Sequence, residues 1–178
     1  MHENLVNKAS SVLAVLHSLK STGVAKEEVE YVVDCSEEAC GDVNQRGGGN
    51  FAKAVAEIAG LMNATGSDAR GFCAGPAHAL IEAASLVKAG AYKTVAVIGG
   101  GCVPKLGMNG KDHVKKDVPL LEDCIASFCI LISENDGVSP EINLDIIGRH
   151  TVGTGSAPQN VIGSLVADPL ERVGLKIT

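Results

Sequence analysis

The sequence predicts an α/β fold, a layered α/β/α domain built around a mixed, mostly parallel sheet. Two observations predict it. Helix-like and strand-like segments alternate through most of the 178 residues, and two apolar segments then follow each other across a short turn, as in an antiparallel hairpin. A hydrophobic content of 46% excludes a disordered protein, and the length suits one domain with a sizeable core.

The first part of the chain predicts a helix, a strand and a second helix. Apolar residues recur in steps of three and four over residues 3–21, which is typical of an amphipathic helix, and Gly23 ends it. The β-branched run at 30–34 predicts a buried strand. Asn50 then caps a helix that continues to about residue 62. The buried faces are expected to consist of Leu5, Ala9, Val12, Leu13, Leu16 and Leu19 in the first helix, and of Phe51, Val55, Ile58 and either Ala59 or Met62 in the second.

The middle of the chain repeats this alternation. Residues 69–73 form a short apolar strand, and the alanine-rich helix 76–89 follows and ends at Gly90. Residues 94–98 are the clearest strand. The glycines 99–101 at its end allow the backbone to approach another group closely.

The last third predicts a loop, two strands and a helix. Residues 102–122 are polar and long for a structureless connection, so we expect a functional loop. The apolar segments 124–133 and 142–151 are expected to pair as a hairpin across an Asn-Asp-Gly turn. A last helix is expected at 159–167.

Composition excludes several classes of protein. The net charge of −6, with two Tyr, three Phe and no Trp, gives neither the basic surface nor the stacking platform of a nucleic-acid binder. No apolar run has the length of a membrane span, so we expect no membrane contact and a cytoplasmic location. The six cysteines lack C-x-x-C spacing, which favours reduced thiols and no metal; a redox or metal pair of Cys35 and Cys40 is the weaker alternative.

Cys73 is the principal candidate nucleophile. It lies at the bend between a predicted strand and a helix, where Gly75 permits a tight turn and Pro76 suits the first helical position. The positive end of the helix favours a thiolate, and the Cys73 N–H is a candidate oxyanion donor. The alternative is a small buried thiol packed at a strand end. The expected oxyanion donors and rim of the site are Ala74, Gly75, Gly100 and Gly101.

Two histidines and two anion-binding segments complete the candidate site. His78 lies on a polar helical stripe, which favours a surface or interface position. His113, in the lysine-rich loop, is the better catalytic candidate, with simple solvent exposure as its alternative. Helix N-terminal N–H groups favour anions, so the glycine-rich run before the second helix is a candidate phosphate site, with a flexible turn as its alternative. The candidate anion ligands are Arg46, Gly47, Gly48, Gly49, Asn50, Lys105, Asn109 and Lys111.

Several motifs carry a resemblance to known families. Residues 69–101, with Cys73-Ala74-Gly75, resemble the nucleophile region of thiolase-fold condensing enzymes such as type III β-ketoacyl-acyl-carrier-protein synthases. CSEEACGD at 35–42, NQRGGGNFAK at 44–53 and KLGMNGKDH at 105–113 resemble the component C β subunits of glycine/sarcosine/betaine reductases, and this likeness extends along nearly the whole chain.

The second resemblance implies a function. Cys73 takes the position of the superfamily nucleophile, in a subunit where an acetyl group on a carrier selenocysteine is converted through an enzyme thioester into acetyl phosphate. Phosphate is then a co-substrate, and no cofactor is implied. The implied partners are the α subunit of component C and the selenocysteine carrier protein, in a homo- or hetero-oligomer. The rival functions are a noncatalytic docking subunit and a self-contained condensing enzyme of the type III ketoacyl-synthase kind.

The resemblance also implies a division of the fold. Thiolase-fold enzymes have two similar halves, and the catalytic histidine comes from the second. Residues 1–152 resemble the first half, and 153–178 would lead into a second half that is absent, so we expect an internal piece that is inactive when isolated. The family's central first strand is absent too, which would leave backbone groups unpaired. We expect residues 142–151 to fill that position, parallel to 94–98.

Overall fold

The computed structural model describes residues 2–36, 50–102, 114–117, 125–149 and 159–176 of the chain. They belong to two compact units, Met1–Glu134 and Asn135–Thr178. The sheet and the three helices that cover it lie in the first unit.

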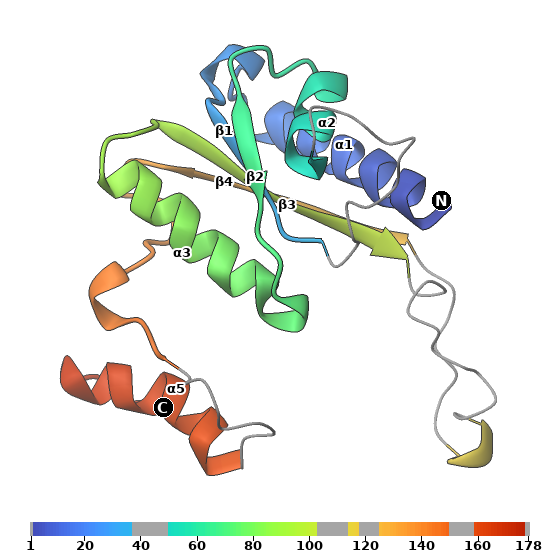
Figure 1. Cartoon of the computed structure of the whole chain (residues 1–178). Coiled ribbons are helices and arrows are strands. Elements are labelled where there is room, and N and C mark those ends of the chain that lie inside the picture. The colour runs from blue at the N-terminus through green and yellow to red at the C-terminus, as the bar shows by residue number, and fades with distance from the viewer. Residues whose placement is uncertain (1, 37–49, 103–113, 118–124, 150–158, 177–178) are drawn as a thin grey trace. The chain divides into compact units, whose positions relative to one another are not determined.

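A four-stranded sheet forms the centre of the first unit (Figure 1). Its strands are β1 (Tyr31–Asp34), β2 (Thr65–Asp68), β3 (Thr94–Cys102) and β4 (Ile125–Ser133). They lie in the order β2-β1-β3-β4, with β1 parallel to β2 and β3, and β4 antiparallel to β3. The prediction of a mixed, mostly parallel sheet is confirmed.

Helices cover both faces of this sheet (Figure 1). α1 (His2–Thr22) and α2 (Phe51–Ala59) pack on one face, and α3 (Gly75–Lys88) packs on the other. Successive residues of β1 point to opposite faces, because side chains alternate along a strand. Val32 therefore packs with α1 and α2, and Val33 packs with α3. The predicted α/β/α layering is confirmed for this unit.

The buried face of α1 differs from the predicted one. Its buried residues include Val12, Val15 and Leu19, but also the polar residues Asn7, Lys8, Ser10 and Ser11. Leu5, Leu13 and Leu16 are 50%, 67% and 37% exposed, and Ala9 is exposed as well. The reason is that the N-terminal half of α1 packs against polar groups beyond the end of β1, where Ser36 bonds Asn7.

α2 begins as predicted and ends earlier. Asn50 Oδ1 accepts a hydrogen bond from Lys53 N–H at 2.8 Å, and the helix ends before Gly60, whose φ of +80° suits glycine. Ala59, rather than Met62, is the buried residue of the last turn. Ile58 was expected to be buried and is 66% exposed.

The strand expected at 69–73 is instead β2, at Thr65–Asp68. Its polar sequence carries no apolar pattern, yet it pairs along its whole length with β1. Backbone bonds continue this pairing at both ends, from Thr65 N–H to Glu30 O and from Ala69 N–H to Asp34 O. The backbone ladder therefore determines this strand, and residues 69–71 become part of the turn before Cys73.

The predicted hairpin near the end of the chain is wrong. β4 forms where a strand was expected, but it pairs with β3, which continues through the glycines 99–101 to Cys102. Within 142–149 the structure has the short 3₁₀ helix η5 (Leu144–Ile146). The predicted pairing of this segment with β3 is also wrong, because β1 and β4 already flank β3.

The second unit contains η5 and α5 (Gln159–Arg172). The helix was expected to end at Ala167, but it continues past Pro169. The domain boundary expected at 152–153 falls outside the described residues, whereas the division between the compact units falls after Glu134.

Candidate active site

Cys73 lies in a short 3₁₀ turn, η3 (Phe72–Ala74), between β2 and α3. The predicted bend is confirmed, and the thiol is exposed, which excludes the alternative of a buried structural cysteine. Phe72 has a φ of +47°, which is uncommon for a residue with a side chain. Ala74 N–H donates to Gly71 O and Gly75 N–H donates to Phe72 O, so both groups are bonded within the turn.

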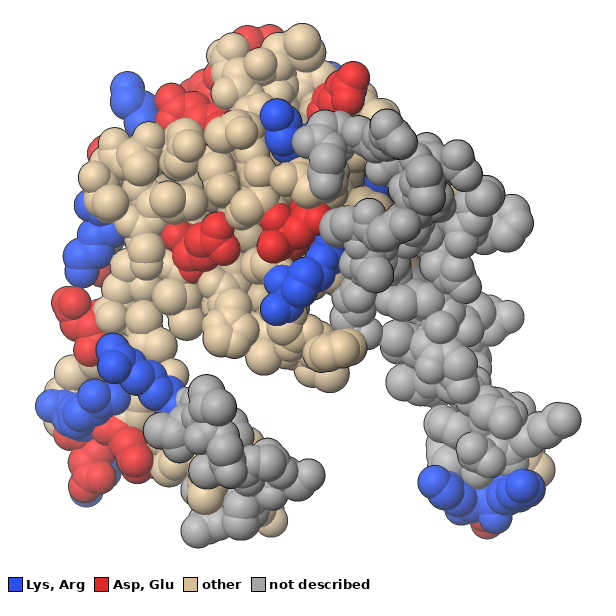
Figure 2. All heavy atoms as spheres, viewed as in Figure 1, with Lys and Arg blue, Asp and Glu red and all other residues tan. Residues whose placement is uncertain are grey.

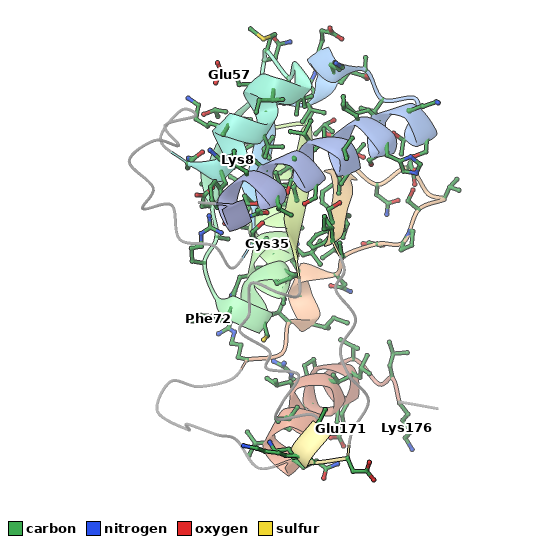
Figure 3. All side chains as sticks on the ribbon, turned by 90° about the vertical axis from the view of Figure 1, so that its right-hand side faces the viewer. Lys8, Cys35, Glu57, Phe72, Glu171 and Lys176 are labelled. Atoms are coloured by element: carbon green, nitrogen blue, oxygen red, sulfur yellow. The ribbon has the colours of Figure 1, made fainter. Side chains whose placement is uncertain are left out.

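A pocket of about 290 Å³ opens beside Cys73. Residues from the ends of three strands and from the start of α3 line it: Cys35 and Ser36 after β1, Gly99 and Gly100 of β3, Ala126, Ser127 and Phe128 of β4, and Phe72, Cys73 and Pro76. Carboxyl ends of adjacent parallel strands meet at one edge of a sheet, where ligands of open α/β sheets bind. Figure 3 labels Cys35 in the interior of the first unit and Phe72 in the turn before α3.

The second thiol of this pocket belongs to Cys35, which is buried. Its Sγ donates to Ile98 O at 3.2 Å. Burial, with a smaller contribution from the neighbouring Asp34 charge, raises the pKa of the Cys35 thiol to about 11. Cys35 therefore stays protonated at neutral pH and is no competing nucleophile.

Ser36 joins the pocket to a buried polar network. Its hydroxyl lies 2.7 Å from Asp34 Oδ1 and 2.9 Å from Asn7 Oδ1, and it accepts a hydrogen bond from Gly100 N–H at 3.1 Å. Burial raises the pKa of Asp34 to about 6, while the Ser36 hydrogen bond and the Arg70 charge act in the opposite direction. The network fixes the ends of β1 and β3 next to the pocket.

The close backbone approach predicted for the glycines after residue 98 is confirmed at two positions. A Cβ on Gly100 would lie 2.5 Å from Ser10 Oγ and 2.6 Å from Ser11 Oγ of α1. A Cβ on Gly99 would lie 2.7 Å from the Phe128 ring. These glycines let α1 and the Phe128 ring reach the sheet.

The chain is similar to a known subunit over its whole length. It is 65% identical over all 178 residues to the glycine/sarcosine/betaine reductase complex component C subunit beta of Peptoclostridium acidaminophilum. The chain is a relative of that subunit. It spans 35% of the subunit's length, and the resemblance stated from the sequence is confirmed. No protein-family model matches the chain.

One solved structure shows the fold. A variant of Xanthomonas campestris OleA, bound with cerulenin, matches with a TM-score of 0.55 and 14% identity, over 74% of this chain and 41% of that one. The fold is thiolase-like. The β-ketoacyl-[acyl carrier protein] synthase III of Thermus thermophilus matches with 26% identity and a TM-score of 0.45, over 53% of this chain and 27% of that one.

One predicted anion site of this thiolase-like domain needs a correction. The first N–H groups of α2 were expected to hold an external anion, but Phe51 N–H and Ala52 N–H donate to the Asp68 carboxylate at 3.1 and 3.0 Å. Asn50 takes the Lys53 N–H. The protein's own carboxylate therefore occupies this helix end. The run Arg46, Gly47, Gly48 and Gly49 lies outside the described residues, and its role stays a prediction.

The structure brings together only part of the predicted site. Gly100 lines the pocket with Cys73, and Gly101 lies next along β3. His78 is exposed on α3, as expected. His113, Lys105, Asn109 and Lys111 fall outside the described residues, as does Cys40. Sequence reasoning missed Ser36 and Phe128, although Ser36 lies two residues after a predicted strand.

Two observations concern the classes of site excluded from composition. No helix of the described part is both long and apolar enough to cross a membrane. The described residues hold no cluster of three or more His, Cys, Asp or Glu side chains suited to a metal ion.

On the face in Figure 2, the acidic and basic side chains of the described residues are scattered over a largely uncharged surface.

Proposed function

We propose that this chain supplies the acyl-carrying cysteine for acyl transfer to phosphate, as part of a component C β-type subunit. The observation that carries the proposal is the exposed Cys73 thiol, at the start of α3, in a pocket at the carboxyl ends of parallel strands. The 65% identity to the named reductase subunit supports the choice of substrate class.

The local helix geometry suits a thiol nucleophile. α3 begins without a side-chain cap, whereas the first turn of α2 is capped by both Asn50 and Asp68. The positive end of the α3 dipole therefore faces the turn that carries Cys73, which favours negative charge that develops on an acyl oxygen bound there. A pocket of about 290 Å³ suits a small acyl group such as acetyl.

The proposed reaction has two steps. Cys73 Sγ attacks the acetyl carbonyl carbon on the carrier selenium; a C–S bond forms, the C–Se bond breaks, and the selenolate leaves. A phosphate oxygen then attacks the thioester carbonyl carbon, the C–S bond breaks, and acetyl phosphate leaves with Cys73 regenerated as the thiolate. The proposed partners are therefore the selenocysteine carrier protein and the α subunit of component C, with phosphate as co-substrate and no cofactor.

The proton acceptor for Cys73 is proposed to come from elsewhere in the assembled protein. The described lining of the pocket contains no histidine. His113 remains the candidate from the sequence. We therefore expect the isolated chain to be inactive.

Mass spectrometry of the complete complex tests this proposal. The complex is incubated with acetyl phosphate, which runs the second step in reverse, and its peptides are mapped. We expect an acetyl group on Cys73, its loss in Cys73→Ser, and its retention in the control Cys129→Ser, whose thiol lies half-buried on β4 outside this pocket.

Other outcomes assign the rival functions. Acetylation of the partner alone would assign this chain a docking role. Acetyl transfer by the isolated chain to a carrier-bound malonyl group would assign a self-contained condensing enzyme.

A further inference from the structure

We propose that Arg70 is a positioning residue for Cys73, which fixes the turn that carries the thiol to the ends of β1 and β2. The inference rests on the proposed role of Cys73 as the acyl carrier. Arg70 itself lies outside the described lining of the pocket, and it acts through the backbone of residues 71–73.

The Arg70 guanidinium binds two strands at once. Nη1 lies 3.0 Å from Asp34 Oδ2 at the end of β1, and Nη2 lies 2.9 Å from Asp68 Oδ2 at the end of β2. Nη1 also donates to the Ser36 carbonyl oxygen. A planar fork of donors matches such a set of oxygens, and a lysine ammonium at the end of a flexible chain does not.

The oxygens that Arg70 binds are themselves held in place. The side chains of Asp34 and Asp68 are 1% and 9% exposed. Asp34 also bonds Ser36, and Asp68 accepts the first two N–H groups of α2. The Arg70 guanidinium carbon lies 5.2 Å from the centre of the Phe51 ring, which shields one side of the ion pairs from water. Arg70 is therefore anchored on a fixed frame.

The turn that follows Arg70 requires such an anchor. Phe72 has a φ of +47°, and its side chain is 79% exposed, so that packing of the ring does not hold this conformation. A residue in a sparsely populated backbone conformation persists only when its surroundings determine it. On the upstream side, Ala69 N–H is bonded to Asp34 O and the Arg70 side chain is bonded to both strands.

The same contact also holds Ser36, another residue that lines the pocket. Its carbonyl accepts from Arg70, and its hydroxyl accepts the Gly100 N–H. A Cβ on Gly75, in the first turn of α3, would lie 3.1 Å from Cys35 O, so α3 also abuts this segment closely. Arg70 thus fixes the turn that carries Cys73 relative to Ser36, and both residues line the pocket.

Thiol alkylation in the full chain tests the inference without any acyl donor. Arg70→Lys keeps the charge beside buried Asp34, so no buried carboxylate is left uncompensated. With iodoacetamide at neutral pH and quantification by peptide mass spectrometry, we expect Cys73 to react roughly tenfold more slowly, because a small displacement removes it from the helix end. Cys129, which lies on β4 outside the pocket and reports on an intact fold, should keep its native rate. The matched control Arg172→Lys, in the second unit, should leave Cys73 unchanged.

A second variant separates positioning from a general structural role. Glycine adopts a positive φ without strain, so Phe72→Gly should make the turn less dependent on its anchor. In the Phe72→Gly background, we expect Arg70→Lys to slow the alkylation of Cys73 by less than about threefold. Such non-additivity is expected when two residues are coupled.

Three results would overturn the inference. They are a Cys73 rate in Arg70→Lys within twofold of the native rate or above it, an equal change at Cys129, and an undiminished tenfold loss in the Phe72→Gly background. The acetylation experiment fails or succeeds independently of these rates. Absence of acetyl-Cys73 together with the expected alkylation rates would reject the proposed function and leave Arg70 as the residue that positions the turn.

Discussion

Two thiols line one pocket, and their surroundings give them opposite properties. Cys35 is 5% exposed, its Sγ–H donates a hydrogen bond to Ile98 O, and burial raises its pKa to about 11. Cys73 is exposed and lies at the start of α3. A pocket with one exposed thiol and one buried, protonated thiol offers an alkylating reagent a single accessible sulfur. Alkylation at neutral pH should therefore modify Cys73 long before Cys35.

Asp34 makes the stability of the first unit depend on pH. Burial raises its pKa from 3.8 to about 6, so between these values the folded protein holds a proton that the unfolded chain has released. The stabilising contribution is complete below about pH 4 and is lost as the pH rises through 6. We compare the free energy of unfolding of the native protein with that of Asp34→Asn. We expect the difference between them to fall by on the order of 2 kcal/mol from pH 4 to pH 7.

Urea unfolding of both proteins across this pH range measures the difference. The matched variant Asp145→Asn, in the second unit, should follow the native curve. Parallel curves for native protein and Asp34→Asn would show that Asp34 titrates alike in the folded and unfolded states.

At the residue scale, sequence reasoning located Cys73 and missed its supports. A cysteine followed by glycine and proline is a local signal, and the bend is where that signal places it. Two partners of Ser36, Asn7 and Gly100, lie 29 and 64 residues away, and no local pattern predicts such pairs. Arg70 lay inside the apolar strand predicted at 69–73, whereas the observed strand β2 ends at Asp68 and leaves Arg70 in the turn that follows.

At the scale of elements, the contact between α1 and β3 depends on a missing side chain. In Gly100→Ala the new methyl group would lie 2.8 Å from the backbone oxygen of Asn7, besides its clashes with Ser10 and Ser11. Serine hydroxyls can rotate away, but a backbone carbonyl moves only with the helix. We expect Gly100→Ala to lower the free energy of unfolding by about 1–3 kcal/mol.

Chemical denaturation of the variant, with Gly163→Ala as control, checks this expectation. A Cβ at Gly163 of α5 would meet nothing within 4 Å, so the control should be neutral or stabilising by up to about 1 kcal/mol. Equal effects at the two glycines would contradict the close approach of α1 to β3.

The helices were predicted more securely than the faces that they bury. Periodicity and capping residues placed α1, α2 and α3 within a few residues of their observed bounds. Periodicity in α1 selects the leucines, but the sheet edge beneath its first half is polar, and it favours Asn7, Ser10 and Ser11 instead. Leu5 and Leu13 are exposed and form an apolar strip on α1. The described residues leave this strip uncovered.

At the scale of the whole molecule, the family resemblance led us to expect an additional central strand in the sheet. The observed sheet has no such strand among the described residues. β1 pairs directly with β3, with Val32 opposite Ala96 and Val33 opposite Val97. Backbone groups that would have been left unpaired are thereby satisfied in the interior of the sheet. Local sequence signals identified the strands 30–34, 94–98 and 124–133, but their order depends on pairing between distant segments, which periodicity does not encode.

This topology makes a prediction for hydrogen exchange along the chain. β1 and β3 each have a partner on both sides, whereas β2 and β4 have one partner in the described sheet, and residues 142–149 pair with no strand described here. Buried, fully bonded central strands open only in large cooperative events, so we expect the amides of Val33 and Val97 to exchange at least about 100-fold more slowly than those of Asp145 and Ile146. Residue-resolved exchange of the full chain, by mass spectrometry or NMR, measures these rates. Equal protection of 142–149 and β3 would mean that this segment joins the sheet in solution, and it would restore the pairing that the structure contradicts. Slow exchange confined to β1 and β3 would instead show that the frame which holds Ser36, Arg70 and Cys73 is the most stable part of the molecule, as a site built on strand ends requires.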